Sequence, residues 1–433
     1  MSFKRLQIKN WRQFRELDIE FHSRLTIITG ANGAGKTTVL NLLSRHFGWQ
    51  GTLVSTPRRK EKSKVFHSDY WTDESLAKYE KWLGQTGTRE EEEDEEPPLP
   101  PEPTGPRQPI GTLTYGEGVT AALEVSPLVG PQYNVEILQQ QAQLGIHIPS
   151  HRPIYSYQAV ESIPTVPRPR SQAFSQYMGI VQARYYGGHH QRTPNYFMKE
   201  TLIALAAFGY GNAAIDKDQE SLETFEGFQR ILHRVLPPSI GFVRLAIRLP
   251  EVVLVTRSGD FSIDAVSGGV AALIDLAWQV FMFGDDKQNF VVTLDEPENH
   301  LHPELQRTVL GSLLDAFPNV QFICASHNPF IVTSVPQSHV YALGYGDDAR
   351  VKSQQLSSAD RSGSSNEVLR DVLGLPSSSP LWVDKELESI ETKLADRPLT
   401  QDLLNELRQE LTASGLERFL PQSLANLAKG APK

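Results

Sequence analysis

Apolar and polar residues at the start of the chain follow a strand pattern and then a helical one. Strands are predicted at Phe3–Ile8, Leu17–Phe21 and Leu25–Thr29, where apolar, β-branched and aromatic residues recur at short intervals. The next apolar residues recur at helical spacing: Val39, Leu40, Leu42, Leu43 and Phe47. We therefore expect a strand that runs through a short loop into a helix between residues 25 and 47.

Further strand and helix patterns follow after an interruption. Strands are predicted at Ile110–Tyr115, Thr120–Val125 and Gly145–Ile148, which together form an antiparallel patch. Helical spacing extends over Thr201–Val235, and a β-hairpin is expected within Val243–Thr256. Strands and helices mixed along one chain are typical of an α/β protein.

The second half of the chain continues this mixture. A long apolar helix is predicted over Ala271–Phe283, and core strands over Phe290–Leu294 and Val320–Ala325. Near the C-terminus two amphipathic helices carry apolar stripes, ahead of a stop signal at Gly415: Val383, Leu387, Ile390 and Leu394, then Leu403, Leu404, Leu407 and Leu411. These helices predict a C-terminal helical region over 351–433, either packed on the core or used to dock a partner.

The pattern breaks down between residues 51 and 109. Glu90–Glu96 is almost continuously acidic, and Pro97–Pro109 is rich in proline. Repeated like charges and prolines cannot pack into a core, so about 84–109 is predicted to be disordered. The predicted organisation is a discontinuous core with an inserted segment: core residues 1–50 and 110–350, a helical lobe at about 152–240, and an insertion at 51–109.

Charge and composition limit the kinds of partner. The chain has 433 residues, a net charge of −9 and a pI near 5.8, so any contact with DNA or RNA must be local. The stretch Arg152–Lys199 is basic and contains tyrosines, which suits nucleic-acid binding and a solvated helical surface equally. No signal segment or membrane-length apolar run is visible, and the single cysteine suits a reducing compartment. We expect a cytoplasmic protein without a membrane partner.

The loop after the third strand carries phosphate-binding chemistry. Gly30–Thr38 matches the pattern G-x-x-x-x-G-K-[ST] at every fixed position, and its glycines let backbone N–H groups point at phosphate oxygens. The following helix adds the partial positive charge of its N-terminus. Lys36 is expected to reach the β- and γ-phosphates as a catalytic residue, and the Thr37 hydroxyl to ligate Mg²⁺. The predicted ligands of ATP in this loop are Asn32, Gly33, Ala34, Gly35, Lys36, Thr37 and Thr38.

The strand at Phe290–Leu294 ends in two carboxylates, the Walker B arrangement. Asp295 is expected to hold Mg²⁺, and Glu296 to orient and deprotonate the attacking water. His327 directly follows the strand Val320–Ala325 and Ser326. At that position it can contact the γ-phosphate and act as a switch, so we predict Glu296 and His327 as catalytic residues.

Two further segments are candidates for nucleotide contact. Ser267, Gly268 and Gly269 begin the long apolar helix, and small residues at a helix start form an anion-binding end. Arg12 lies in the turn between the first two strands. It is either close to the nucleotide or a solvated turn arginine.

In this order the motifs resemble those of ABC-type ATPases of the RecF/SMC/OLD group. Leu6–Arg12 leads into the phosphate loop as in that group, and Asp295–Pro303 and Ala325–Pro329 resemble its later motifs. The resemblance covers roughly residues 1–50 and 110–345. It implies an α/β fold with a P-loop ATPase core, in which a mixed sheet carries an antiparallel β lobe, plus a helical lobe and a helical C-terminal tail.

The resemblance also implies how the site works. Ser267, Gly268 and Gly269 of one subunit would cover the γ-phosphate held by the P-loop of another, in a head-to-tail homodimer or a higher homo-oligomer. His302 stands where the group has an acidic residue, so coupling across the dimer departs from the family pattern. Gln139–Gln141 and the stretch Ser150–Arg152 both compete for the position of the Q-loop glutamine.

The function implied is an ATP-hydrolysing switch. There is no long heptad repeat before Ser267 and no second acidic constellation after Glu296, so the chain is similar to stand-alone ATPases of anti-phage defence modules. Those of Septu and some retrons work with a separate nuclease, and we expect this chain to gate such an effector. The alternative is a RecF-like ATPase of DNA repair or replication that binds DNA itself.

Overall fold

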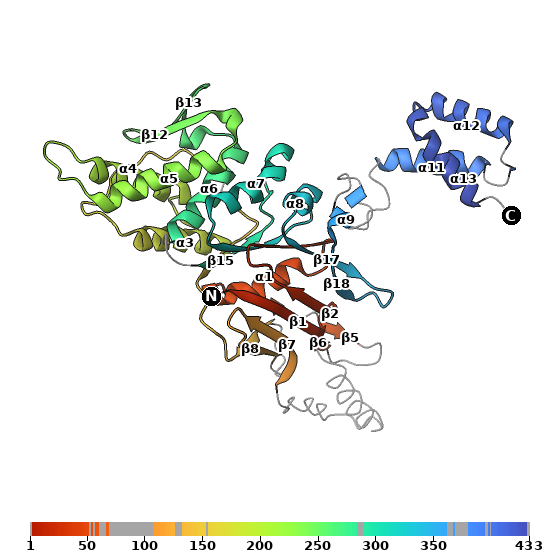
Figure 1. Cartoon of the computed structure of the whole chain (residues 1–433), viewed down its shortest axis with the longest axis horizontal. Helices are drawn as coiled ribbons and strands as arrows, with labels where there is room; N and C mark the ends of the chain where they lie inside the picture. The colour runs from red at the N-terminus through yellow and green to blue at the C-terminus, as the bar shows by residue number, and fades with distance from the viewer. Residues whose placement is uncertain are drawn as a thin grey trace, which may run out of the picture. The chain divides into compact units, whose positions relative to one another are not determined.

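The computed structural model describes most of the chain. The described residues are 2–51, 53–54, 57–59, 66–68, 107–125, 132–152, 155–284, 289–361, 367–368, 380–394, 397–398 and 400–430. They form two compact units, within Met1–Ser365 and Asn366–Lys433 (Figure 1). The acidic and proline-rich segment predicted to be disordered covers about residues 84–109. Its residues 84–106 lie outside the described residues.

The first unit is organised around an eleven-stranded sheet of order β10-β8-β7-β1-β2-β18-β17-β3-β16-β15-β11. Neighbours from β10 to β2 are antiparallel, and neighbours from β17 to β11 are parallel. This mixed sheet with an antiparallel part confirms the predicted fold class. The predicted place of Gly145–Ile148 in the antiparallel patch was wrong, because this strand pairs in parallel with Phe290–Asp295 at the other end of the sheet. The strands are β1 Phe3–Trp11, β2 Phe14–Glu20, β3 Leu25–Gly30, β7 Gln108–Tyr115, β8 Thr120–Val125, β10 Val135–Leu138, β11 Gly145–Ile148, β15 Phe290–Asp295, β16 Val320–Ala325, β17 His339–Tyr345 and β18 Val351–Gln355.

Three strands of this sheet, β10, β17 and β18, were not indicated by the sequence patterns, and β10 pairs antiparallel with β8. β17 pairs in parallel with β3, and β18 pairs with both β17 and β2. The sheet therefore continues past residue 350, where the predicted core ended. Smaller strands pair outside it: β4 Leu53–Val54 with β9 Gln132–Tyr133, and β5 Pro57–Arg59 with β6 Phe66–Ser68.

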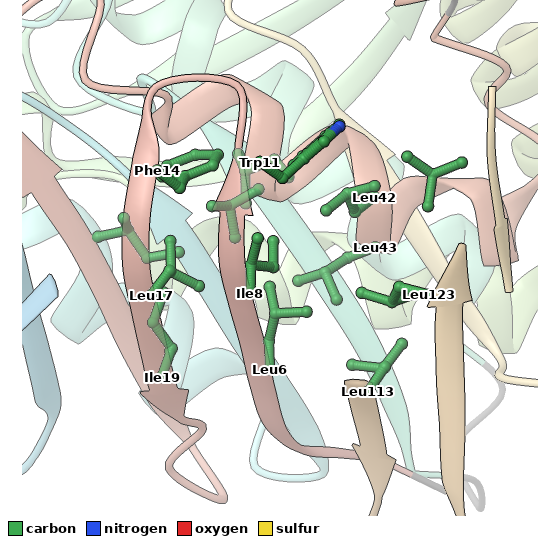
Figure 2. Packing of buried hydrophobic residues seen from close by; sticks show 14 of the residues in the cluster. Leu6, Ile8, Trp11, Phe14, Leu17, Ile19, Leu42, Leu43, Leu113 and Leu123 are labelled. Carbon is green, nitrogen blue, oxygen red and sulfur yellow. The ribbon is translucent and has the colours of Figure 1, made fainter. Parts of the chain in front are cut away.

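Alternation along β1 and β2 buries one face of each strand. Leu6 and Ile8 of β1 and Leu17 and Ile19 of β2 are buried in one apolar cluster. That cluster includes Leu43 of α1 (Lys36–Ser44), and Figure 2 shows its side chain directed towards β1. Burying these side chains holds α1, and with it the P-loop, against the sheet.

Helices and a small sheet form the lobe labelled α3 to α6 in Figure 1. In it α4 packs on α3 and α5, and both α3 and α5 pack on α6. The predicted hairpin is confirmed, because β12 and β13 pair antiparallel and β14 continues the sheet. Among the described residues, no helix has the length and apolarity that crossing a bilayer requires. The bounds are α3 Arg170–Tyr185, α4 Pro194–Tyr210, α5 Gln219–Val235, α6 Gly268–Phe283, α7 Pro303–Ala316, α8 Pro329–Thr333, α9 Ser358–Arg361, β12 Phe242–Arg248, β13 Glu251–Thr256 and β14 Gly259–Ser262, with 3₁₀ turns at Arg45–Phe47, Pro238–Ile240 and Ile263–Ala265.

The helical pattern over Thr201–Val235 belongs to two helices and not one. Gly211 takes a φ of 61° and ends α4. The side chain of Asp218 then accepts a hydrogen bond from the backbone N–H of Ser221 and begins α5. A left-handed glycine followed by an acidic N-cap breaks the helix although the apolar spacing continues.

The described part of the second unit includes a group of helices that share their own apolar cluster. They are α11 Leu381–Leu394, α12 Gln401–Ala413 and α13 Leu420–Gly430, with a 3₁₀ turn at Glu417–Phe419. The predicted stripes of α11 and α12 are buried in this cluster, except for the half-buried Leu404. Gly415 ends α12 with a φ of 69°, as its position predicted. The stripes therefore pack against each other and are not free to dock a partner.

Candidate active site

The P-loop requires glycine at the positions where the backbone turns most sharply. Gly30, Gly33 and Gly35 have φ values of 139°, 81° and 96°. A Cβ atom at Gly30 would lie 2.4 Å from the carbonyl oxygen of Leu343 in β17, and one at Gly35 would lie 2.4 Å from the ring of Phe14. At Gly30 and Gly35 both the left-handed backbone and the close neighbours exclude larger residues, and at Gly33 the backbone conformation alone favours glycine. This local shape leads β3 directly into α1.

Lys36 and Thr37 occupy the first turn of α1. The Lys36 ammonium donates to the carbonyl oxygens of Gly30 at 2.9 Å and Ala31 at 3.1 Å, so it lies across the loop. Burial lowers the pKa of Lys36. The Thr37 hydroxyl donates to Asp295 Oδ2 at 3.1 Å. The structure therefore brings together the two predicted Mg²⁺ ligands.

Asp295 is a buried carboxylate at the end of β15. Burial raises its pKa to about 6; the nearby Glu296 also raises it, while the hydrogen bond from Thr37 lowers it. Because β15 and β3 both pair with β16 in parallel, their carboxyl ends meet at one edge of the sheet. A cation at this edge would compensate the cost of burying the charged carboxylate.

Replacing Asp295 by Asn should stabilise the nucleotide-free protein. Because the folded pKa of about 6 exceeds the ordinary 3.8, the folded state binds the extra proton between these values, and stability falls as pH rises through that window. The difference in pKa corresponds to a loss of at most ~3 kcal/mol by pH 7. Urea unfolding at pH 4 and pH 7 should show a larger advantage for the variant at pH 7, together with weaker stabilisation by Mg²⁺ and ATP.

The variant Asp18→Asn is a control of opposite sign. The hydrogen bond from Arg5 lowers the pKa of Asp18, so this carboxylate stabilises the folded state at pH 7, and its removal should destabilise the protein there. If Asp295→Asn raises the free energy of unfolding by the same amount at pH 4 and pH 7, the gain does not come from the raised pKa of Asp295.

Glu296 is held at both of its carboxylate oxygens. Nδ1 of His327 lies 3.0 Å from Oε1, and Nδ2 of Asn299 donates to Oε2 at 3.0 Å. His327 reaches this position because β16 lies beside β15 in the sheet. Asn299 was not predicted as a site residue, although its place three residues after Glu296 puts it in the same tight turn. The two contacts fix the direction of the carboxylate.

The start of α6 presents small residues. Ser267 and Gly268 are exposed, and within the described residues the Ser267 side chain makes no capping hydrogen bond. A Cβ at Gly268 would meet no described atom within 4 Å, whereas one at Gly269 would lie 3.2 Å from the carbonyl oxygen of His300. One side of this turn therefore packs on the segment after Glu296, and the other side faces solvent.

The remaining predicted residues are placed as follows. Asn32 and Gly33 are exposed at the loop, Ala34 is buried beneath it, and Thr38 is half-buried. Arg12 has a φ of 50° and points its Nη1 at the Val54 carbonyl oxygen, 3.4 Å away, and at the Tyr133 hydroxyl, 3.3 Å away. Its contacts lie on the small β4–β9 sheet, and a role in nucleotide binding stays a prediction.

Most basic residues of the stretch Arg152–Lys199 form ion pairs or hydrogen bonds with other residues of this chain. Arg168 lies 2.7 Å from the buried Glu200, and the fully buried Lys199 pairs with Asp264. Arg170 donates to the Phe281 carbonyl, Arg192 lies 3.3 Å from Glu161, and Arg152 is buried against the turn after β15. These contacts hold the lobe together. Binding of DNA by this stretch stays a prediction.

Two family models match the segments that build this site. Residues 5–81 match a model described as "AAA domain", and residues 212–333 match one described as "AAA domain, putative AbiEii toxin, Type IV TA system". These segments contain the P-loop, the start of α6, the Asp295–Glu296 pair and His327. The matched segments and the order of strands in the sheet together indicate the class of protein. The chain resembles ABC-type P-loop ATPases of the RecF/SMC group.

Two more particular relatives are a Septu protein and a probable ATPase of a retron. The Septu protein PtuA of Bacillus thuringiensis is 25% identical over 165 residues, covering 35% of this chain and 42% of that protein. The retron Vc95 probable ATPase of Vibrio cholerae serotype O1 biovar El Tor is 29% identical over 99 residues, 21% of this chain and 19% of that protein. The chain thus spans less than half the length of these relatives. The predicted resemblance to Septu- and retron-type ATPases is confirmed.

A solved structure also matches most of the chain. The SMC head domain from Thermotoga maritima is 15% identical, and the match covers 82% of this chain and 100% of that one, with a TM-score of 0.41.

Proposed function

We propose that the chain hydrolyses ATP as a switch that closes as a homodimer around two nucleotides and gates an associated effector. The arrangement around Glu296 carries this proposal, because a carboxylate held by His327 and Asn299 stands next to the Thr37–Asp295 pair. The similarity to the Septu protein and the retron ATPase supports the part that concerns an effector.

The residues of the site fit a magnesium nucleotide. Among the described residues, the Lys36 ammonium donates to two loop carbonyls, and it can exchange these for phosphate oxygens. Thr37 and Asp295 offer the hydroxyl and carboxylate oxygens that Mg²⁺ prefers. Bound Mg²⁺ would neutralise charge on the phosphate oxygens.

Glu296 is the proposed general base. Its two oxygens are held by His327 and Asn299, so the remaining lone pairs have a fixed direction in which to orient and deprotonate a water molecule. The His327 side chain is half exposed, which leaves its ring free to donate to a phosphoryl group while Nδ1 remains with Glu296. ATP supplies the phosphoryl group, and the protein supplies orientation and charge.

Replacing Ser267 by Arg should prevent closure of the dimer without loss of ATP binding. Ser267 is exposed, so a longer side chain fits the monomer but would project into a nucleotide held by a second subunit. Size-exclusion chromatography checks this in the Glu296→Gln background with ATP, where the parent should elute as a dimer and the double variant as a monomer. Ser171→Arg, at an exposed serine in the first turn of α3, is the matched control. A dimer that persists with Ser267→Arg would refute the head-to-tail arrangement.

The effector is tested by purifying tagged Glu296→Gln protein from its native host with ATP and Mg²⁺. A stoichiometric nuclease or toxin that is absent from a parallel Lys36→Ala purification would support gating of an effector. Nucleic acid retained without a protein partner would instead favour a RecF-like protein whose output is DNA binding.

A further inference from the structure

One buried arginine holds the backbone that carries the catalytic carboxylate. Arg152 follows β11 and is only 8% exposed. Its guanidinium donates to the carbonyl oxygens of Glu296 at 2.9 Å, Pro297 at 3.0 Å and Asn299 at 3.2 Å. Three hydrogen bonds from one side chain therefore span the turn that follows β15.

That turn begins with a strained residue. Glu296 has a φ of 46°, in the left-handed region that residues with a Cβ atom rarely occupy. Such a conformation persists only where the surroundings determine it. The hydrogen bond from Arg152 fixes the orientation of the Glu296 carbonyl group. It thereby holds the peptide group between Glu296 and Pro297, directly after the residue with the strained φ.

A second contact ties the same two segments together. Nδ2 of Asn299 donates to the Ser150 carbonyl oxygen at 3.3 Å as well as to Glu296 Oε2. The segment Ser150–Arg152 is thus joined to the Glu296 turn in both directions. This segment leaves β11 of the core sheet and leads towards the helical lobe.

We propose that Arg152 is a positioning residue that sets the direction of the Glu296 carboxylate for the attack of water and couples it to the segment leading to the helical lobe. The inference rests on the proposed ATPase function. Arg152 acts through the backbone and does not touch the nucleotide in this role.

The geometry requires arginine and not merely a positive charge. A planar guanidinium presents five donors in a fixed fork, which matches several carbonyl oxygens at once. A lysine carries its donors on a single nitrogen atom, so it cannot span three carbonyl oxygens of the turn as the planar guanidinium does. The variant Arg152→Lys therefore keeps the charge but releases part of the turn.

Arg24 offers a matched control. Its guanidinium also caps backbone carbonyls, those of Leu314 at 2.7 Å, Phe317 at 3.1 Å and Val320 at 2.7 Å, at the far end of β16 from His327. Arg24→Lys removes comparable backbone bonds away from Glu296. It measures the cost to stability without the proposed effect on catalysis.

The test compares ATP hydrolysis, ATP affinity and thermal stability of the full-length variants. Arg152→Lys should lower kcat on the order of 10²-fold, as a small displacement of a catalytic group does, with ATP affinity within about 3-fold of wild type. Arg24→Lys should lower the Tm and leave kcat nearly unchanged. If Arg152→Lys is not recovered folded, Arg152→Gln, which can still donate to part of the turn, is measured in its place with the same expectation.

A double variant separates positioning from general damage. Because both changes act on one group, Arg152→Lys combined with Glu296→Gln should turn over no more slowly than Glu296→Gln alone. A further multiplicative loss in the double variant, or an unchanged kcat in Arg152→Lys, would overturn the inference. Failure of the proposed function is distinct, because the wild type would then show no ATP hydrolysis.

Discussion

Glu296→Gln protein is expected to bind ATP and to hydrolyse it on the order of 10²–10⁴-fold more slowly than wild type. Glutamine has nearly the same shape, and its amide oxygen can still accept the hydrogen bond from Asn299 that now reaches Glu296 Oε2 at 3.0 Å. It cannot take a proton from water. The loss should therefore appear in kcat and not in nucleotide affinity.

Phosphate release and nucleotide titration on the same preparation measure both quantities. Glu304→Gln is the control, since Glu304 is an exposed carboxylate in the first turn of α7 and takes no part in the site. Its turnover should match that of wild type. Turnover at the wild-type rate in Glu296→Gln would exclude Glu296 as the base.

Lys36→Ala is expected to weaken ATP binding by ~10²–10⁴-fold. Two charge-assisted hydrogen bonds to phosphate oxygens are worth about 3–6 kcal/mol together, which corresponds to that range of affinity. In the nucleotide-free protein the same ammonium is buried and donates to the carbonyls of Gly30 and Ala31. Its removal therefore also leaves two loop carbonyls without their present donor.

Titration with a fluorescent ATP analogue, with and without Mg²⁺, measures the effect. Lys9→Ala removes an exposed lysine of β1 that lies 3.5 Å from Glu16, and it controls for loss of charge alone. An affinity of Lys36→Ala equal to that of Lys9→Ala would show that the P-loop does not hold the phosphates.

The local part of the site could be read from the sequence because its geometry is encoded locally. A strand, a glycine loop and a helix start are set by neighbouring residues, so the P-loop between Leu25 and Ser44 needed no knowledge of distant contacts. The pairing of Thr37 with Asp295 followed from two motifs that each end a parallel strand. In the structure Thr37 and Asp295 lie at the positions that these two motifs indicated.

Other features depend on atoms that the sequence does not display. The acceptors of Arg152 are backbone carbonyls, which every residue has, so no pattern of side chains marks them. β18 was missed because its residues Val351–Gln355 are mostly polar, and their place is set by pairing with β17 and β2. The division of Thr201–Val235 depended on the backbone conformation of Gly211, which periodicity does not report.

The position of β3 in the sheet also governs when the nucleotide site can form during synthesis. β3 lies between β16 and β17, which are translated only after most of the first unit has been made. Until β16 emerges from the ribosome, this strand, which is buried along its whole length in the folded unit, has both edges unpaired. Its second edge stays unpaired until β17 has been made. We therefore expect the phosphate-binding loop, which directly follows β3, to become fixed late in the folding of the first unit.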